Sequence, residues 1–166
     1  MLTVRRTFEL GEHPQPVTLA ECKAYLRVTH TADDALIDSF IDIARLELEN
    51  QTGVALIQSE VYVEETEYKD YFRLPFAPMN HVFVATLDGR DIREEFRNDA
   101  LEYRIIRDHL ALKSSGHLLI HYRTAPAGNA KLPMLDLVAA LYTNRGSDYV
   151  QPKRITEWIQ THTRRL

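Results

Sequence analysis

An apolar stretch of the sequence, LPMLDLVAALYTNR at residues 132–145, has the residue spacing of an α-helix. Large side chains recur at positions i, i+3, i+4, i+7 and i+8, which places on one helix face Met134, Leu137, Val138, Leu141 and Tyr142. Apolar residues fill much of the remaining circumference, so this helix is predicted to lie buried at the centre of the core. Pro133 suits the first helical turn, and Gly146 can take the left-handed conformation that ends a helix after Arg145.

Two further helices are predicted before this stretch. The first begins at Thr18, where Thr18 and Glu21 form a T-x-x-E capping box that satisfies free backbone N–H groups. The second is predicted to begin after a cap at Thr31 and to end at Gly53. Its buried stripe is predicted to consist of Ile37, Phe40, Ile41, Ala44 and Leu48. We expect this second helix to pack against residues 132–145.

Between the second helix and the apolar stretch, the hydrophobic pattern changes to the period of two residues that is typical of β-strands. The alternation is clear at Val61 and Val63, and a strand over residues 81–87 leads into the turn pair Asp88-Gly89. Further short strands are predicted at residues 103–107, 110–113 and 117–124. Residues 58–125 are therefore predicted to form a small antiparallel β module.

The predicted fold class is α+β, with a helical core of three to four helices and an inserted antiparallel β module. A length of 166 residues fits a single domain. Its predicted parts are an N-terminal arm or edge strand (1–15), helices one and two (16–57), the β module (58–125), the core helix (126–146) and a C-terminal tail helix (147–166). Pro152 is predicted to open the tail helix, which runs from Lys153 to about His162 and carries the single Trp.

The net charge of −4 argues against tight nucleic-acid binding by the whole chain, because neutralising phosphates requires clustered Lys and Arg. Residues 141–166 carry five basic against two acidic residues, a balance of +3, so the rest carries −7. This basic tail indicates electrostatic docking to a partner, although a few solvated charges at a terminus explain it equally well. No apolar run approaches the roughly 20 residues of a membrane span, and no leader pattern is present, so a cytosolic location without a membrane is predicted.

Candidate catalytic and metal-binding residues do not form a recognised motif. His117 and His121 share a strand face but lie about 13 Å apart, too far for one ion. Asp33 and Asp34 point about 100° apart on a helix, and the helix dipole accounts for acids in a first turn. Cys22 is predicted to be a small buried hydrophobic residue. No catalytic residue, cofactor or metal is therefore predicted, and the protein is not expected to be an enzyme.

Three segments resemble, in this order, the head-tail connector (adaptor) proteins of tailed bacteriophages and prophages: PVTLAECKAYLRV (residues 16–28), ADDALIDSFIDIARLELENQTGVALI (32–57) and LPMLDLVAALYTNRG (132–146). Each motif is weak alone, and the specificity comes from their order and spacing. Two residues depart from the family pattern. Cys22 stands where the family usually has Ala, and Asp136 interrupts the apolar helix, where it needs a polar partner if it is buried.

The resemblance implies a non-enzymatic assembly protein. Connectors form a ring, typically of twelve subunits, beneath the portal, where they extend the DNA channel and provide the platform for neck or tail attachment after DNA packaging. The expected partners are the portal ring, a neck, stopper or tail-completion protein, other copies of the chain, and genomic DNA that passes through the lumen without sequence recognition. The expected location is the head-tail junction of the virion, after assembly in the host cytoplasm, and the chain can be monomeric in solution.

The tail is the hypothesised portal-docking element, because Trp and Arg are enriched where binding energy concentrates. Its residues are Arg154, Ile155, Trp158, Ile159, Arg164 and Arg165. The alternative for this helix is that it folds onto its own core. A second class of function is a small phage-encoded metal-dependent nuclease or other enzyme, which would use carboxylates. A DNA-binding regulator is the weakest option, because the second helix carries six acids against Arg45 alone.

Overall fold

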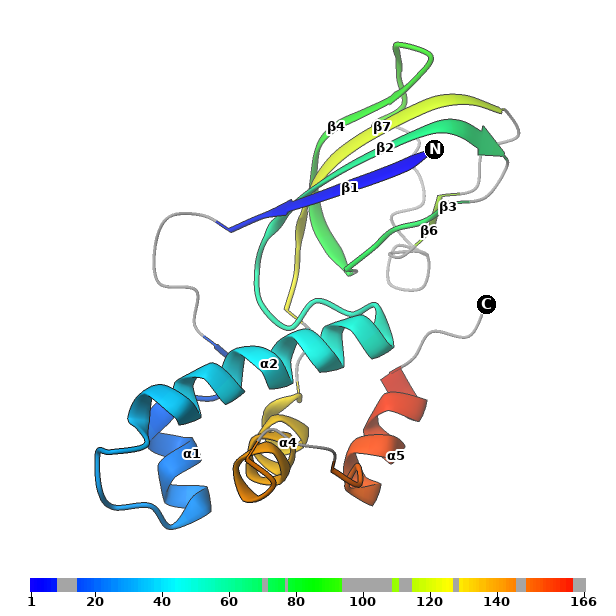
Figure 1. Ribbon diagram of the computed structural model, residues 1–166. Coiled ribbons are helices and arrows are strands. Elements are labelled where there is room, and N and C mark those ends of the chain that lie inside the picture. The colour runs from blue at the N-terminus through cyan, green and yellow to red at the C-terminus, as the bar shows by residue number, and fades with distance from the viewer. Residues whose placement is uncertain are drawn as a thin grey trace. The chain divides into compact units, whose positions relative to one another are not determined.

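A computed structural model describes residues 1–8, 15–69, 72–76, 78–93, 109–110, 115–126, 129–145 and 149–162. The described residues form helices and antiparallel sheets, so the predicted α+β class is confirmed (Figure 1). The chain forms two compact units. A β unit comprises residues 1–13 and 58–126, and a helical unit comprises residues 14–57 and 127–166. That the two behave as one domain stays a prediction.

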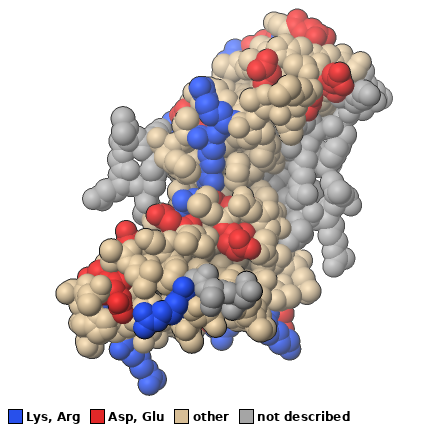
Figure 2. Space-filling model, viewed as in Figure 1, with Lys and Arg blue, Asp and Glu red and all other residues tan. Residues whose placement is uncertain are grey.

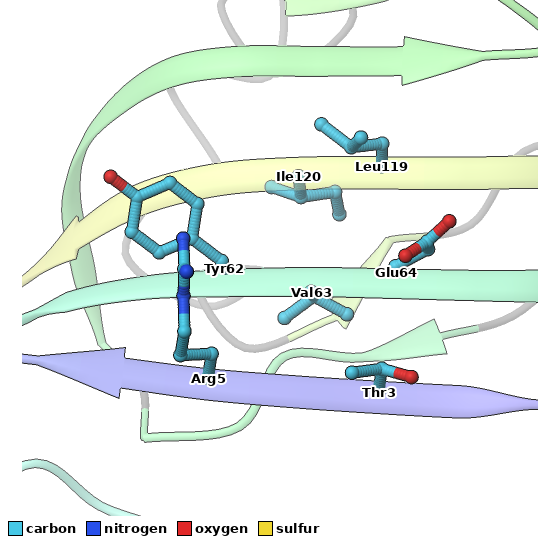
Figure 3. A pocket seen from close by; sticks show the side chains of 7 residues that line it. All are labelled: Thr3, Arg5, Tyr62, Val63, Glu64, Leu119 and Ile120. Atoms are coloured by element: carbon cyan, nitrogen blue, oxygen red, sulfur yellow. The ribbon is translucent and has the colours of Figure 1, made fainter.

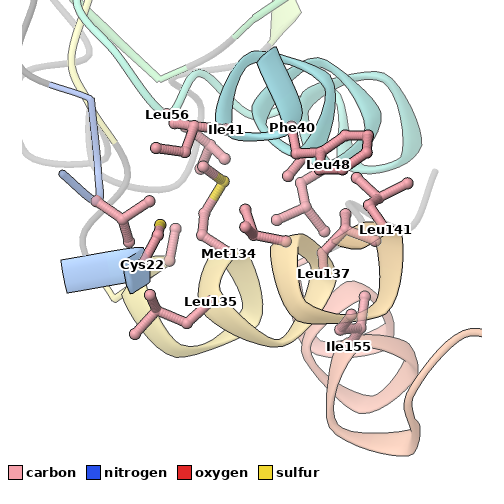
Figure 4. Packing of buried hydrophobic residues seen from close by; sticks show 14 of the residues in the cluster. Cys22, Phe40, Ile41, Leu48, Leu56, Met134, Leu135, Leu137, Leu141 and Ile155 are labelled. Atoms are coloured by element: carbon pink, nitrogen blue, oxygen red, sulfur yellow. The ribbon is translucent and has the colours of Figure 1, made fainter. Parts of the chain in front are cut away.

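The helical unit is built around α4 (Lys131–Thr143), which contacts each of the other three helices. These are α1 (Leu19–Leu26), α2 (Asp34–Thr52) and α5 (Lys153–His162). The predicted apolar stripe of α4 packs against the predicted stripe of α2 (Figure 4). The core they share includes Ile37, Phe40, Ile41, Ala44, Leu48, Met134, Leu137, Val138 and Leu141. None of the helices in the described ranges is both long and apolar enough to cross a membrane.

The ends of α1 and α2 follow the sequence signals in part. The capping box of α1 is confirmed, because Thr18 Oγ1 accepts from Glu21 N at 3.2 Å and Glu21 Oε2 accepts from Thr18 N at 2.9 Å. Gly53 ends α2 with φ 68°, also as predicted. The predicted start of α2 after Thr31 is wrong, since the helix begins at Asp34. Asp33 occupies the N-cap position without capping, because its carboxylate accepts from the distant Tyr142 hydroxyl.

The C-terminal end of α4 also differs from the prediction. The helix stops at Thr143 rather than Arg145, and Arg145 itself has a positive φ of 53°. Asn144 explains the early stop, because its side-chain amide donates to Ala140 O at 2.7 Å and satisfies a carbonyl of the last turn. Pro133 lies in the first helical turn as predicted. Gly146 lies outside the described residues.

The β unit holds a five-stranded antiparallel sheet of order β1-β2-β7-β4-β5. Its strands are β1 (Leu2–Thr7), β2 (Glu60–Lys69), β7 (Ser115–Thr124), β4 (Met79–Leu87) and β5 (Arg90–Asp91). A separate pair joins β3 (Phe72–Arg73) to β6 (His109–Leu110). One face of the sheet buries a second core of Val61, Val63, Tyr68, Leu74, Met79, Ala85, Leu87, Ile92, Leu118, Ile120 and Tyr122.

Two predicted features of the β unit are settled by the strand pairing. Residues 2–7 form an edge strand, which was one of the two alternatives for the N-terminal segment. The Asp88-Gly89 turn is confirmed, because Leu87 pairs with Arg90 and both turn residues have positive φ, 50° and 79°. The predicted strand at 103–107 lies outside the described residues. Of the predicted strand at 110–113, only Leu110 is described, and it belongs to β6.

Candidate functional site

Asp136 on α4 ties together three helices of the helical unit. Its Oδ1 accepts a hydrogen bond from the Tyr25 hydroxyl of α1, and its Oδ2 lies 3.1 Å from Nη1 of Arg154 on α5. The Asp136 side chain is only 12% exposed, and a carboxylate buried to this extent needs polar partners. Tyr25 and Arg154 are those partners, as the sequence predicted for a buried Asp136. The hydrogen bond to Asp136, together with burial, raises the pKa of Tyr25. Sequence reasoning identified Asp136 as unusual but gave no signal for its partners.

The structure distributes the six predicted portal-docking residues over different environments. Ile155 and Trp158 are buried in the core of their own helical unit, and Ile159 is partly buried against it. Arg154 is exposed, while Arg164 and Arg165 lie outside the described residues. In the single chain, α5 therefore packs on the core of its own helical unit, which was the predicted alternative to portal docking. That the tail also docks on a portal stays a prediction.

The exposed face of α5 is the part of the helix available to a partner. The side chain of Lys153 is 89% exposed and that of Arg154 is 57% exposed. Glu157 lies one turn from Lys153, with Oε1 3.4 Å from Nζ. Trp158 turns inward and stacks on His162, with ring centroids 4.3 Å apart. A partner approaching α5 thus meets basic side chains at its first turn rather than the indole ring.

The sheet face opposite the β core carries aromatic and charged side chains. Arg5 of β1 lies over the Tyr62 ring at 4.5 Å, and Tyr62 stacks on His121 with centroids 3.8 Å apart. Beside them is an open pocket of about 330 Å³ (Figure 3). It is lined by Thr3, Arg5, Tyr62, Val63, Glu64, Leu119 and Ile120. The location of the pocket depends on the pairing of β1 with β2, which the sequence does not reveal.

Histidines and acids on this sheet face are paired across strands instead of gathered at one point. His117 Nε2 lies 2.8 Å from Glu64 Oε1, and His121 Nε2 lies 3.0 Å from Glu60 Oε2. Burial opposes ionisation of Glu60, but hydrogen bonds from His121 and Arg123 hold the pKa of its carboxyl below the usual value. Within the described ranges, no group of three or more His, Cys, Asp or Glu residues is placed to hold a metal ion.

The other candidate chemical groups have structural partners. Cys22 is fully buried, as predicted, and burial, followed by the nearby Glu21 and Asp38 charges, raises the pKa of its thiol to about 11. Asp34 lies 2.5 Å from Lys23 Nζ, while Asp33 binds Tyr142. None of these groups is arranged as an activated nucleophile.

Acidic and basic side chains are interspersed over the face of the molecule that Figure 2 shows. On that face the described residues form no continuous basic surface of the kind that grips a phosphate backbone. The arrangement agrees with the acidic balance of the body of the chain.

Residues 16–86 match the model of a protein family described as phage gp6-like head-tail connector protein. The predicted resemblance to head-tail connectors is confirmed. The matched stretch contains α1, α2 and most of the strands up to β4, and so it includes the first two of the three segments that carried the resemblance. The matched stretch ends before α4 and α5 of this connector-like chain, and so it does not include Asp136 or Arg154.

Two solved structures contain chains similar to the whole connector-like chain. One is from the virion of a native gene transfer agent particle, with a TM-score of 0.66 and 19% sequence identity, covering 100% of this chain and 97% of that chain. The other is from the neck of an empty gene transfer agent particle computed with C6 symmetry, with a TM-score of 0.62, 18% identity and the same two coverages. These similarities establish a shared fold over the full length. No curated protein matches the connector-like chain.

Proposed function

We propose that this protein is a head-tail connector subunit, which assembles as a ring beneath a portal, extends the DNA channel and provides the platform for neck or tail attachment after DNA packaging. The observation that carries the proposal is the connector-family match of residues 16–86 in a chain with the fold of a neck chain along its whole length. The protein then belongs at the head-tail junction of the virion, after assembly in the host cytoplasm.

A structural role fits the chemistry of the described residues. The buried Cys22 thiol is held in its neutral form, and the acids are paired with Lys, Arg, His or Tyr in several places. The family is named for assembly and not for a reaction. The part of the chain that the structure describes holds no carboxylate cluster of the kind that a metal-dependent nuclease uses, and the proposed role is non-enzymatic.

The proposed partners are a portal ring, a neck, stopper or tail-completion protein, and other copies of this chain in a ring, with twelve as the expected number. Genomic DNA would pass through the lumen without sequence recognition. An acidic body supports this last role, because like charge keeps DNA from adhering to the wall of a channel.

Docking to the portal is proposed for the tail. Arg154 and the partly exposed Ile159 are accessible on α5, and Arg164 and Arg165 follow the helix in sequence. Ile155 and Trp158 would contribute by holding α5 in position on the core, since both side chains are buried there. The tail would then present basic groups to an acidic groove between portal subunits.

The test is negative-stain microscopy of the purified protein mixed with portal rings encoded in the same genome. We expect an additional ring at the narrow end of the portal. The same portal preparation without the protein is the control for the dimensions of the portal alone. Portals that stay unchanged at saturating protein would contradict the proposed function.

A further inference from the structure

α2 exposes three large aliphatic side chains on the side that faces away from its core. Leu36, Ile43 and Leu46 are 39%, 46% and 45% exposed. Their spacing places them along one face of the helix, together with Ser39 and Asn50. Exposed apolar side chains that gather on one face of a protein mark a candidate interaction site. We call it the α2 outer surface.

α4 has a second partly apolar surface on its own outward side. Leu132, Asp136, Ala139 and Thr143 follow one another at i, i+4, i+7 and i+11. Leu132 is 53% exposed, and Tyr25 of α1, whose hydroxyl donates to Asp136, is 43% exposed. Ala139 is small, so a helix carrying larger side chains can approach closely there. We call this the α4 outer surface.

The two surfaces lie on opposite sides of the helical unit. α2 and α4 pack directly against each other, and the side chains between them include Phe40, Leu48, Leu137 and Leu141 (Figure 4). Residues half a turn away from this contact on each helix must therefore point away from the other helix. One subunit thus presents exposed aliphatic side chains on its α2 side and a partly apolar surface on its α4 side.

The charges around the two surfaces differ. α2 carries five acidic residues, but Glu49 is buried with the single basic residue, Arg45, and Asp34 is bound by Lys23. Outside those two pairs, α2 carries Asp38, Asp42 and Glu47. At the α4 surface, Lys131 is bound by Glu21 and Arg154 by Asp136, so charges of the two signs balance. Two copies would therefore repel each other if they met through their α2 sides, whereas this repulsion is absent when α2 of one meets α4 of the next.

We propose that the α2 outer surface of one copy docks onto the α4 outer surface of the next copy, so that the helical unit forms the head-to-tail contact of the ring. The occupant of each surface is thus a second copy of this chain. A contact between two different surfaces, repeated from copy to copy, generates a ring when the rotation closes. This inference rests on the proposed ring-forming function and adds the residues through which neighbours meet.

The test uses one charged substitution on each surface, Ile43→Asp and Leu132→Asp. The matched control is Val84→Asp, because Val84 is 39% exposed and lies in the β unit, outside both surfaces and outside the tail. Each protein is mixed with portal rings, cross-linked with glutaraldehyde and separated on a denaturing gel, and thermal unfolding confirms that each variant is folded. We expect wild type and Val84→Asp to give multimers and an added ring, and each surface variant alone to give neither.

A mixture of the two surface variants distinguishes a head-to-tail contact from other arrangements. Ile43→Asp retains an intact α4 surface and Leu132→Asp retains an intact α2 surface, so the mixture should form cross-linked dimers but no larger species. Complete rings formed by both single variants would overturn the interface and leave the proposed function standing. Self-association of Leu132→Asp alone into dimers would indicate an α2–α2 contact and would also overturn it.

Failure of the proposed function has a different signature. Wild-type protein that adds no ring to the portal would contradict that function. The interface would then be tested by cross-linking the protein alone at high concentration. If wild type formed no cross-linked multimers, the proposed interface would be overturned. Multimers that form with wild type and are abolished by each surface variant would support it.

Discussion

Arg45 and Glu49 form a buried ion pair within α2, with Nη1 of the arginine 2.9 Å from Oε2 of the glutamate. Glu49 has no exposed surface, and Arg45 is 6% exposed. The other carboxylate oxygen, Oε1, accepts from the backbone N–H of Leu56 at 2.8 Å. The pair therefore anchors the chain segment that leaves α2 after Gly53.

Replacing Glu49 with Ala should destabilise the protein strongly, because the buried Arg45 would lose its close partner and keep only Asp42, whose Oδ1 lies 3.6 Å from Nη2. The Leu56 N–H would also lose the Glu49 acceptor. We expect the free energy of unfolding to fall by roughly 3–5 kcal/mol, measured by urea denaturation. Glu47→Ala, on the more exposed side of the same helix, is the control and should change stability by about 0.5 kcal/mol or less. Similar effects of the two substitutions would show that burial of the pair is unimportant.

Cys22 should react slowly with thiol reagents in the folded protein. Burial raises the pKa of its thiol to about 11, so the reactive thiolate is scarce at pH 8. Relative to the unfolded chain, the reaction with a disulfide reagent should slow by about 100-fold or more. The exposed thiol of a Val150→Cys, Cys22→Ala variant provides the fast reference. Equal rates for the two folded proteins would contradict the burial of Cys22.

Tyr25 should make the stability of the helical unit sensitive to alkaline pH. Its pKa is raised in the folded state by the hydrogen bond to Asp136 and by burial, so its contribution is complete below the unfolded pKa and is lost as pH rises through the folded pKa. Tyr25→Phe should cost about 1 kcal/mol at neutral pH and should remove this component of the decline above pH of about 10. Urea unfolding at several pH values measures both effects. If the free energy of unfolding of wild type and of Tyr25→Phe fell in parallel above pH of about 10, Tyr25 would not be the group responsible.

Two truncations should separate the structural role of α5 from its proposed docking role. Ending the chain after Pro152 removes Ile155 and Trp158 from the core, and Trp158→Ala alone should cost roughly 3–5 kcal/mol of stability. Ending it after His162 removes Arg164 and Arg165 but leaves α5 intact, so unfolding should be unchanged while binding to portal rings weakens. If the protein that ends after His162 bound portal rings as well as wild type, a docking role for Arg164 and Arg165 would be excluded.

The features that the sequence predicted well depend on local pattern. The stripe of α4, the Thr18 capping box, the Asp88-Gly89 turn and the burial of Cys22 each follow from residues within a few positions of one another. The predicted start of α2 was wrong because the Asp33 carboxylate accepts a hydrogen bond from Tyr142, more than 100 residues away in the sequence.

The candidate surfaces were less predictable for the same reason. The partners of Asp136 come from α1 and α5, and the pocket beside Tyr62 exists only because β1 pairs with β2. Periodicity indicates which side of a helix is apolar, but not which side chains from remote segments meet there. The functional prediction rested on the order of the three connector-like segments, because no catalytic or metal-binding motif in the sequence indicated a function.

The two segments of the helical unit are interrupted by residues 58–126, and this has a consequence for synthesis. When α2 leaves the ribosome, α4, which covers its buried stripe, has not yet been translated. About 80 further residues must be added, which takes roughly 4–16 s at ordinary elongation rates. Phe40 and Leu48 stay without their native cover during that interval, so the nascent chain presents a binding site for chaperones until translation is almost complete.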